Sequence, residues 1–402
     1  MHTLFAALSM PFPPTNGHRL RTWGLLRALA DDGHEIALVA FADPEEIDDE
    51  NPELLNVCRS VERIPTPGAS GGMGAALRGR ARALFSSYPY GAWRFRSPQF
   101  VDAVARRLEW EQFDLLICDG IYNIHNLPSD LRVPVALNKD DVAHVIVRRY
   151  LAFERHPLRW LYGQLEARKI RAWERRACAS VATTLVCSEV DRAILRRLCP
   201  AAPMPIVPNT VDTEFYAPAG QPEPLTVLFQ GGMDWHPNRD AVEFFAAAIL
   251  PSLRRLVPGV TFRVAGRSPD EQFRRRLAAV PGLEFTGTVP DMRTEIARAT
   301  VCVVPLRIGS GTRLKILEAG AMGKAIVSTR VGAEGLDFRH GEEILLADKP
   351  DGFAQGVAAL LRDAPRRSSL GLAARQRVQK EYSYPALQAA VREALHKLVR
   401  TV

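Results

Sequence analysis

Long apolar runs are missing from this sequence of 402 residues. No stretch of about 18 uninterrupted apolar residues occurs, so we expect no helix that spans a membrane. Residues 2–8 have the pattern of a strand, in place of a charged segment followed by a long apolar stretch, so we expect no signal peptide. Both observations predict a cytoplasmic protein.

Cysteine is also scarce. The six cysteines form no CxxC pair, and no histidine stands at zinc-ligand spacing from them, which argues against a disulfide scaffold and against a structural zinc site. We therefore expect free thiols, as in a reducing compartment. Cys118, Cys187 and Cys302 lie inside apolar runs, which predicts that they are small core residues.

The composition is otherwise that of an ordinary globular protein, with 47% hydrophobic and 24% charged residues. A single hydrophobic core stops growing well below this chain length, so two domains are expected. Strand-like runs alternate with amphipathic helical segments, which predicts an α/β fold with two Rossmann-like, doubly wound parallel sheets. We place the domains at residues 1–199 and 200–384, with a linker at 200–208 and a C-terminal helix at 385–402.

Parallel strands are expected in both domains. In the first domain they fall at residues 2–8, 35–41, 113–118, 133–137 and 180–187, with a helix at 18–30. In the second they fall at residues 225–230, 261–265, 283–286, 301–306, 325–329 and 343–346. Because ligands of such sheets bind beyond the carboxyl ends of the strands, we expect functional residues there.

Positive charge is concentrated in two segments, residues 75–97 and 145–176, although the net charge is only +7. The basic residues are Arg78, Arg80, Arg82, Arg94 and Arg96 in the first segment, and Arg148, Arg149, Arg155, Arg159, Arg168, Lys169, Arg171, Arg175 and Arg176 in the second. Aromatic residues and leucines stand between them. This composition suits an anionic membrane surface or a phosphorylated acceptor. The alternative is a solvated helix face with a buried aromatic stripe.

Residues 301–336 have the order strand, loop, helix, strand. The loop of small residues runs from Gly309 to Thr312, and a helical pattern begins at Arg313. We expect Ser310 or Thr312 to cap this helix, and we expect the loop glycines to let the backbone approach a ligand closely. Because the N-terminus of a helix offers unpaired N–H groups, the order predicts a phosphate site.

Charged residues at the start of this helix support an anion site. Arg313 and Lys315 place positive charge in the expected first turn, where the helix dipole ordinarily favours acidic residues. Glu318 follows about one and a half turns into the helix, and a carboxylate there can accept hydrogen bonds from two hydroxyls of a vicinal diol such as a ribose. The alternative is a solvated face on which Glu318 is the i,i+3 partner of Lys315.

Four segments together resemble a known family. Residues 309–319, GSGTRLKILEA, look like a Glu-x7-Glu region in its GxGTRLKxLEA variant, and residues 207–212, VPNTVD, resemble an interdomain PNGVD signature. Residues 228–238, LFQGGMDWHPN, look like an FVGSMDWxPN donor-domain opening, and residues 11–17 are similar to a proline-rich first loop. The family is the retaining, nucleotide-sugar-dependent glycosyltransferases of the GT-B fold, of the family four (group 1) type.

The resemblance implies two domains that face each other across a cleft, with the C-terminal helix crossing back to the N-terminal domain. It implies that Glu318 holds the donor ribose and that the amides of Thr312 to Leu314 meet the diphosphate. Arg313 and Lys315 would be the cationic clamp on the leaving group, whose negative charge grows in the transition state. The other donor-binding residues that it implies are Gly17, Gly232, Gly287, Thr288, Val289, Ser310 and Gly311.

Departures from the family pattern concern sugar identity and catalytic detail. Ser310 stands where the first glutamate of the Glu-x7-Glu motif, a contact to the transferred sugar, is expected. Asp140 stands where relatives often have a histidine. The usual Arg and Lys pair after the donor-domain glycines is absent, and Arg267 is the candidate for a phosphate contact, with a surface arginine as the alternative.

Acceptor-side catalytic candidates are Asp119, Asp140 and His144. Each comes just after an apolar run, where residues of a ligand-binding crevice collect in an α/β domain. The alternative for each is a loop or cap residue.

The function expected from these features is transfer of a sugar from a nucleoside diphosphate sugar to a hydroxyl of a carbohydrate, lipid-linked or small-molecule acceptor, with retention. No Asp-x-Asp motif follows a strand, so we expect no metal cofactor. The expected partners include an anionic membrane surface on the inner face of the cell membrane and no nucleic acid. The alternatives are a non-catalytic relative that binds nucleotide or glycan as a partner subunit, and a sugar-nucleotide epimerase or phosphorylase.

Overall fold

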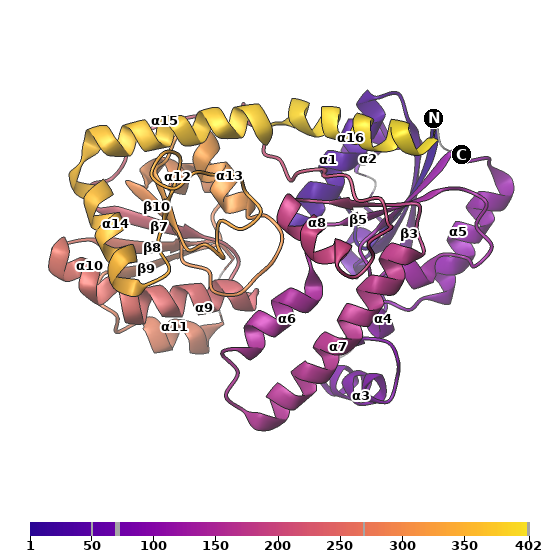
Figure 1. Ribbon diagram of the computed structural model, residues 1–402, viewed down its shortest axis with the longest axis horizontal. Coiled ribbons are helices and arrows are strands. Elements are labelled where there is room, and N and C mark those ends of the chain that lie inside the picture. Colours follow the sequence, from indigo (N-terminus) through magenta and orange to yellow (C-terminus); the bar gives the residue numbers. More distant parts are fainter. Residues whose placement is uncertain (50, 69–72, 268–269, 400–402) are drawn as a thin grey trace. The chain divides into compact units, whose positions relative to one another are not determined.

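The computed structural model describes residues 1–49, 51–68, 73–267 and 270–399. The chain divides into two compact units, one formed by Met1–Asn209 with Leu387–Val402 and one formed by Thr210–Ala386. Each unit contains a six-stranded sheet in which neighbouring strands are parallel (Figure 1). The predicted α/β fold with two doubly wound sheets is confirmed.

The first sheet has the strand order β3-β2-β1-β4-β5-β6. Its strands are β1 (His2–Ala7), β2 (Glu35–Ala42), β3 (Ser60–Pro65), β4 (Leu115–Asp119), β5 (Val135–Lys139) and β6 (Thr183–Val186). The chain builds outward from β1 to β3 and then returns to the other side of β1 at β4. The loops after β1 and β4 therefore diverge, which is the place where such sheets bind ligands.

Helices of the first unit cover both faces of this sheet. They are α1 (Gly17–Asp31), α2 (Pro52–Val57), α3 (Met73–Leu84), α4 (Tyr90–Arg94), α5 (Pro98–Trp110), α6 (Ala143–Leu151), α7 (Pro157–Ala179) and α8 (Glu189–Arg196). α5 shows why the sequence is helical here. Ser97 accepts a hydrogen bond from Phe100 N at 3.2 Å, Pro98 occupies the first turn, and Phe100, Ala103 and Val104 form a buried i, i+3, i+4 stripe.

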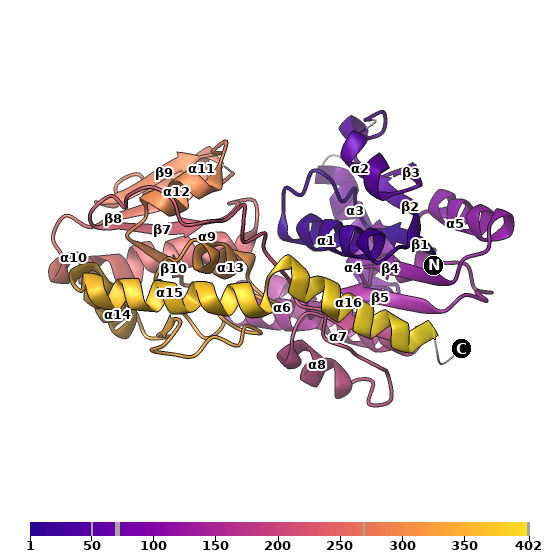
Figure 2. The same ribbon diagram turned by 90° about the horizontal axis from the view of Figure 1, so that it is seen from above.

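The C-terminal helix α16 (Tyr384–Val399) returns to the first unit and lies beside α1 (Figure 2). Gln388 Nε2 donates to Asp31 Oδ2 at 2.9 Å, and Arg392 Nε donates to Asp32 Oδ1 at 2.6 Å. Gly24 lets the two helices approach, since a Cβ there would lie 3.1 Å from a methyl carbon of Leu387. Residues 400–402, the end of the predicted helix, lie outside the described residues.

The second sheet has the equivalent strand order β12-β11-β10-β7-β8-β9. Its strands are β7 (Thr226–Gln230), β8 (Thr261–Ala265), β9 (Leu283–Gly287), β10 (Val301–Val304), β11 (Ile326–Ser328) and β12 (Leu345–Leu346). Its helices are α9 (His236–Phe244), the π-helical turn Phe245–Ile249, α10 (Leu250–Leu256), α11 (Glu271–Leu277), α12 (Met292–Arg298), α13 (Leu314–Ala321), α14 (Pro350–Arg362) and α15 (Ala364–Glu381). Here the loops diverge after β7 and β10.

The core of the second unit is built on aromatic packing across the sheet. Phe245 stacks on Phe262 with ring centroids 4.0 Å apart, and Phe353 meets Phe245 edge-on at 6.0 Å. All three rings are fully buried. This packing supports β8, the strand next to β7.

Some elements differ from the sequence expectations. β3 was not predicted, because Ser-Val-Glu-Arg-Ile-Pro is a mostly half-buried edge strand in which the charged pair Glu62 and Arg63 separates the two apolar residues Val61 and Ile64. Residues 200–209, placed in the second domain by the sequence, group with the first unit, where Val207 N donates to Val186 O at 2.8 Å.

The state of the cysteines and the length of the helices can be compared with the expectations of free core thiols and of no membrane-spanning helix. All six cysteines are free and buried, so the core assignment of Cys118, Cys187 and Cys302 is confirmed. Among the helices of the described residues, none has the length and apolar character needed to cross a bilayer.

Candidate functional site

The loop between β10 and α13 contains Arg313, whose side chain is hydrogen-bonded to backbone carbonyl oxygens of the same loop. Arg313 has extended backbone angles (φ −102°, ψ 103°) and is the N-cap residue, so α13 begins at Leu314. The Arg313 guanidinium donates to the carbonyl oxygens of Ser310 and Gly311, the latter at 2.5 Å. Ser310 or Thr312 was expected to cap the helix, and this was wrong because the loop turns sharply at Gly311 (φ 72°) and delivers residue 313 to the cap.

Lys315 lies in the first turn of α13, at the carboxyl end of β7. Its Nζ donates to Asn238 Oδ1 at 2.9 Å and lies 4.1 Å from the ring centroid of Phe229. Burial, together with the charge of Arg313, lowers the pKa of Lys315 to about 7. Among the described residues, no carboxylate hydrogen-bonds Lys315. An anion bound at the start of α13 would supply the missing negative charge and so favour the ammonium form of this lysine.

Glu318 lies one turn further along α13 and is held by two donors. Tyr216 Oη donates to Oε1 at 3.3 Å, and Gln230 Nε2 donates to Oε2. Burial raises the pKa of Glu318, although Lys315 and the two donors act in the opposite direction. The surface pair of Lys315 and Glu318, the alternative expected from the sequence, does not form between these two described side chains, because Lys315 binds Asn238 instead.

Two glycines after β7 make room for this arrangement. A Cβ at Gly231, whose φ is +149°, would lie 2.7 Å from Asn238 Nδ2 and 2.9 Å from Lys315 Nζ. The same Asn238 donates to Gly232 O at 2.8 Å, so one amide joins the β7 loop to Lys315. Asn238, Lys315 and the glycine loop thus form one connected assembly.

Replacing Gly231 with alanine should lower the unfolding free energy by about 1–3 kcal/mol, because the backbone conformation disfavours a side chain and the new methyl displaces Lys315. Thermal melting measures the effect. Gly352→Ala in α14 is the matched control, since its Cβ would meet nothing closer than 4.0 Å. Equal melting temperatures for the two variants would contradict the packing described here.

The remaining donor-side candidates lie on β8, β9 and their loops. Arg267 Nη2 pairs with Asp234 Oδ2 at 3.3 Å, and both side chains are about half exposed. Gly287 (φ 75°) ends β9, followed by exposed Thr288 and half-buried Val289. Because β9 is separated from β7 by β8, these residues lie about 10 Å across the sheet from the β7 end.

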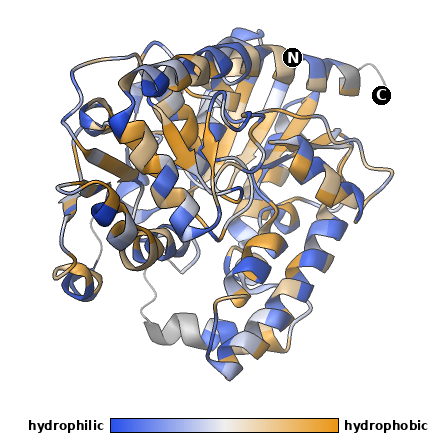
Figure 3. Cartoon of the chain, turned by 60° about the vertical axis from the view of Figure 1, so that its left-hand side comes forward, coloured by the Kyte–Doolittle hydropathy of each residue, from blue (hydrophilic) through white to orange (hydrophobic). Residues whose placement is uncertain are grey.

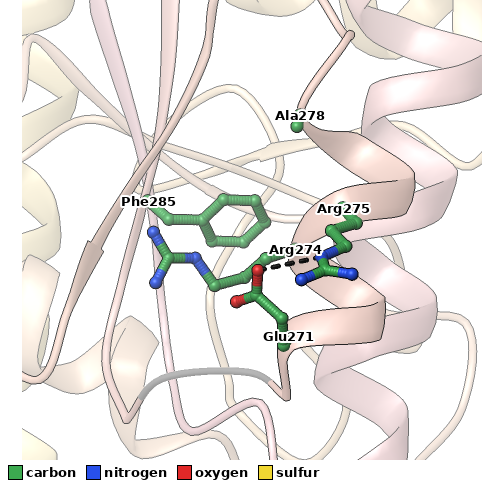
Figure 4. Close-up of a pocket in the computed structure, with 5 residues that line it drawn as sticks. All are labelled: Glu271, Arg274, Arg275, Ala278 and Phe285. Carbon is green, nitrogen blue, oxygen red and sulfur yellow. Dashed lines mark hydrogen bonds and ion pairs between the residues drawn. The ribbon is translucent and has the colours of Figure 1, made fainter.

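A concavity of about 460 Å³ lies nearby, between α11 and β9 (Figure 4). It is lined by Glu271, Arg274, Arg275, Ala278 and Phe285. Glu271 and Arg275 pair with each other at 3.0 Å. None of these residues was among the sequence candidates, and none carries the site described above.

The first unit contains a second polar cluster, centred on His18. This histidine lies in the first turn of α1, which begins at Gly17, and its Nδ1 and Nε2 are each 3.1 Å from a carboxylate oxygen, of Asp140 and Asp119 respectively. Asp119 is fully buried, whereas Asp140 is 32% exposed. Burial alone would lower the pKa of His18, but the two carboxylates raise it well above 6.5.

Asp119 and Asp140 are oriented by neighbours from two elements, α1 and β5. Asn138 Nδ2 donates to Asp119 Oδ1 at 2.7 Å, and Thr22 Oγ1 donates to Asp119 Oδ2 at 3.1 Å. Asn138 Oδ1 in turn accepts from Arg21 Nε at 2.8 Å. Burial opposes ionisation of Asp140, yet its contact with His18 lowers the pKa of this carboxyl. Two of the three acceptor-side candidates are therefore brought together.

His144 lies in a neighbouring buried cluster instead. Its Nδ1 contacts Glu174 Oε2, and Lys139 Nζ binds Glu174 Oε1 at 2.8 Å. Ala143 N donates to the same oxygen at 2.8 Å. Burial opposes the charged form of each partner, but the contact lowers the pKa of Glu174 and raises that of Lys139. Glu174 thus fixes the ring of His144 from α7.

The raised pKa of His18 has a consequence for stability. The stabilisation from its two ion pairs, about 1–3 kcal/mol, should be fully present below pH 6.5 and lost as pH rises through the raised folded pKa. Urea unfolding of wild type and His18→Gln across this range measures it. The gap between the two proteins should narrow as pH rises, and a constant gap would contradict the ion-pair description.

Several functional neighbours were not identified from the sequence. Gln230 and Tyr216 reach Glu318 from 88 and 102 residues away, and His18 reaches Asp119 across about a hundred residues. Gln230 does have a local signal, since it is the polar residue that ends the apolar strand Thr226–Gln230. Among the described residues, no group of three His, Cys, Asp or Glu side chains is arranged to hold a metal ion.

Comparisons with known proteins bear on this architecture. A family model described as Glycosyltransferase Family 4 matches residues 15–215, and one described as Glycosyl transferases group 1 matches residues 224–363. A GDP-mannose-dependent alpha-(1-6)-phosphatidylinositol monomannoside mannosyltransferase of Mycobacterium tuberculosis is 30% identical over 160 residues, 36% of this chain and 42% of that protein. A glycogen synthase of the same organism is 24% identical over 245 residues, 58% of each chain. The chain thus spans about half the length of these relatives.

Solved structures match the whole chain at low identity. They include sucrose-phosphate synthase from Thermosynechococcus elongatus (18% identity, 100% of each chain, TM-score 0.76) and TarM (10% identity, 99% of each chain, TM-score 0.72). HepE of Anabaena, in complex with UDP-glucose, matches with 13% identity, 99% and 100% coverage and a TM-score of 0.64. These likenesses show the GT-B fold. Because the first family model covers half of the chain, the protein belongs to Glycosyltransferase Family 4.

Proposed function

We propose that this chain is a retaining glycosyltransferase that moves a sugar from a nucleoside diphosphate sugar to an acceptor hydroxyl without a metal ion. The observation that carries the proposal is the arrangement of Lys315 and Glu318 at the point where the loops after β7 and β10 diverge. It combines a basic side chain, the N-terminal amides of a helix and a carboxylate within one turn of helix. The family membership supports the same activity.

The diphosphate is proposed to bind at the start of α13. Leu314 and Lys315 offer the backbone N–H groups at the start of the helix, ahead of Ile316 N, which donates to Arg313 O at 3.0 Å, and such N–H groups suit phosphate oxygens. Lys315 supplies the charge. Arg313 is proposed to act together with it, from a guanidinium that also shapes the Ser310–Gly311 backbone. Gly17, Gly232 and Arg267 remain proposed phosphate neighbours.

The nucleoside is proposed to bind through Glu318. Each carboxylate oxygen already accepts one hydrogen bond and has a further lone pair for a ribose hydroxyl. Gly287, Thr288 and Val289 are proposed to meet the base. The mannosyltransferase relative is named as GDP-mannose-dependent, whereas HepE was solved with UDP-glucose, so both bases belong in the donor screen.

In the proposed reaction the bond between the anomeric carbon and the diphosphate oxygen breaks, and the acceptor oxygen bonds to the same face of the sugar. The acceptor proton passes to the departing phosphate oxygen, which balances the step without a protein nucleophile. Lys315 and Arg313 stabilise the charge that grows on the diphosphate. Ser310, with its hydroxyl and amide, replaces the sugar-facing glutamate of relatives.

The acceptor part of the proposal rests on the first unit. Asp140 and Asp119 are carboxylates that accept hydrogen bonds from hydroxyls, and Asp140 is the more exposed of the two. His144 is proposed to act from the buried side of this region, because Glu174 already holds its Nδ1. A carbohydrate, a lipid-linked sugar and a small molecule with a free hydroxyl are the acceptor classes to test.

Release of nucleoside diphosphate from a panel of UDP-, GDP- and ADP-sugars, in excess EDTA and with each acceptor class, tests the proposal. Turnover that survives EDTA, with the donor's anomeric configuration in the product by NMR, is the expected result. Nucleotide binding without turnover would favour a non-catalytic partner subunit. Turnover without acceptor, or only with inorganic phosphate, would favour an epimerase or a phosphorylase.

A further inference from the structure

Charge is distributed very unevenly over the first unit. Residues 78–97 carry five arginines and no acidic residue, and residues 143–179 carry nine basic and three acidic residues. These two segments, named here the basic platform, therefore have a formal charge of +11, whereas the whole chain has +7 and the remainder −4. Two of the three acidic residues, Glu166 and Glu174, are buried.

The basic platform is one packed substructure and not a set of loose helices. α6 and α7 form a helical hairpin that reaches away from the sheet, and α3 lies beside α7 (Figure 1). Lys169 Nζ donates to Ala83 O at 2.6 Å and to Leu84 O at 3.0 Å, and Tyr90 N donates to Glu166 Oε2 at 2.9 Å. Gly163 lets the hairpin close, since a Cβ there would lie 2.4 Å from Leu151.

Large apolar side chains are exposed on this platform. They are Leu84, Phe85, Tyr88, Phe153, Leu158, Trp160 and Leu161, seven of the thirteen exposed large apolar residues among those described. Phe85 is 92% exposed, Leu158 71% and Leu161 62%. Four of the seven lie at the hairpin tip, within residues 153–161, and blue and orange residues alternate along this hairpin in Figure 3.

Arginines flank these apolar side chains without acidic partners. Arg78, Arg82, Arg168 and Arg171 are exposed, and none of them forms an ion pair with any residue that the structure describes. Exposed leucine and phenylalanine are unfavourable in water, and unneutralised arginines repel one another. A partner that relieves both effects at once must offer an apolar interior beneath an anionic surface.

We propose that the basic platform docks on an anionic lipid bilayer, with the hairpin tip and Phe85 at the boundary between headgroups and acyl chains and the arginines on lipid phosphates. The chemistry matches an interfacial helix, in which apolar side chains enter the headgroup boundary and basic ones stay at the surface. A nucleic acid or a soluble phosphorylated acceptor would neutralise the arginines but leave Leu158, Leu161 and Phe85 in water. The bilayer is therefore the partner that the surface favours.

Vesicle co-sedimentation of the full chain tests this, with phosphatidylcholine vesicles alone and with about one third phosphatidylglycerol. Each arginine near an anionic surface contributes about fivefold to partitioning, so Arg168→Gln/Arg171→Gln should weaken binding to the anionic vesicles by at least roughly tenfold. Leu158→Gln/Leu161→Gln should weaken it by a similar factor through lost apolar burial. High salt should weaken wild-type binding.

Matched controls remove the same chemistry elsewhere. Arg196→Gln/Arg197→Gln removes two exposed charges at the end of α8, and Leu55→Gln/Leu372→Gln removes two leucines that are 53% and 59% exposed. Both should partition within about twofold of wild type. All the substituted side chains are exposed, so melting temperatures should stay unchanged, which separates a docking defect from misfolding.

Three outcomes would overturn the proposal: no binding to anionic vesicles, equal binding to neutral ones, or wild-type binding by the leucine variant. The last outcome, combined with retention on a soluble polyanion such as polyphosphate, would identify a charge-only partner instead. The vesicles contain no sugar donor or acceptor. The result therefore does not depend on the proposed glycosyl transfer, and either proposal can fail while the other stands.

Discussion

Glu318→Gln should reduce kcat/KM for the nucleotide sugar roughly 10- to 10²-fold. A carboxylate accepts from both ribose hydroxyls, whereas an amide offers only one oxygen, and each lost hydrogen bond to a charged group is worth about 1.5–3 kcal/mol. Steady-state kinetics with saturating acceptor measure the loss. It should appear in donor binding as well as in turnover, because the ribose is bound in the ground state too.

The same variant should melt no lower than wild type. Burial raises the pKa of Glu318 in the folded state. As pH rises above the ordinary value of 4.5, ionisation of this carboxyl therefore lowers the free energy of unfolding. Removing the charge relieves this effect at neutral pH. Glu342→Gln, on an exposed glutamate paired with Arg339, is the control and should keep full activity. Wild-type activity of the Glu318→Gln protein would contradict the proposed role of Glu318 in donor binding.

Lys315→Met should reduce kcat by about 10²- to 10³-fold, the range for removing one group that stabilises charge in a transition state. Methionine preserves the length and the contact with Phe229 but not the charge. Lys380→Met, on an exposed residue of α15, is the control. Wild-type turnover by Lys315→Met would contradict a role on the leaving group.

The pH dependence of this lysine gives a second signature. With a pKa of about 7 in the free protein, Lys315 must take up a proton to bind a diphosphate above that pH, so donor affinity should fall by up to about tenfold per unit. Arginine stays charged, so Lys315→Arg should abolish this slope whatever its absolute affinity. The free energy of unfolding changes with pH in the opposite direction to donor affinity. The folded state gains relative to the unfolded state from about pH 7 to 10.5, because the unfolded chain alone holds that proton.

Local patterns in the sequence predicted much of the architecture. Runs such as residues 227–229 and Val301–Val304 are buried and apolar throughout, so parallel strands can be predicted there from residue type alone. The strand, small-residue loop and helix around Gly309 to Glu318 were also predictable, because glycine and charge signals lie within ten residues. β3 was not, since an edge strand need not be apolar.

The contacts that shape the candidate site were not predictable in the same way. Arg313 was expected in the helix and instead folds onto the Ser310 and Gly311 carbonyls, a choice set by backbone geometry that spacing does not encode. Likewise, the alternative in which Lys315 pairs with Glu318 by i,i+3 proximity is not realised, because Asn238, 77 residues earlier, binds Lys315. Periodicity reports on neighbours along the chain, whereas the contact between Lys315 and Asn238 depends on the strand order.

We propose that α13 and the β7 loop form a nucleoside diphosphate site built on Lys315 and Glu318. Titration calorimetry of the full chain with UDP, GDP and ADP in EDTA tests it most directly, in buffers of different ionisation enthalpy. We expect at least one nucleotide to bind with proton uptake above pH 7, and Glu318→Gln and Lys315→Met to weaken binding at least roughly tenfold. No binding by any of the three, or binding that neither substitution changes, would contradict the claim.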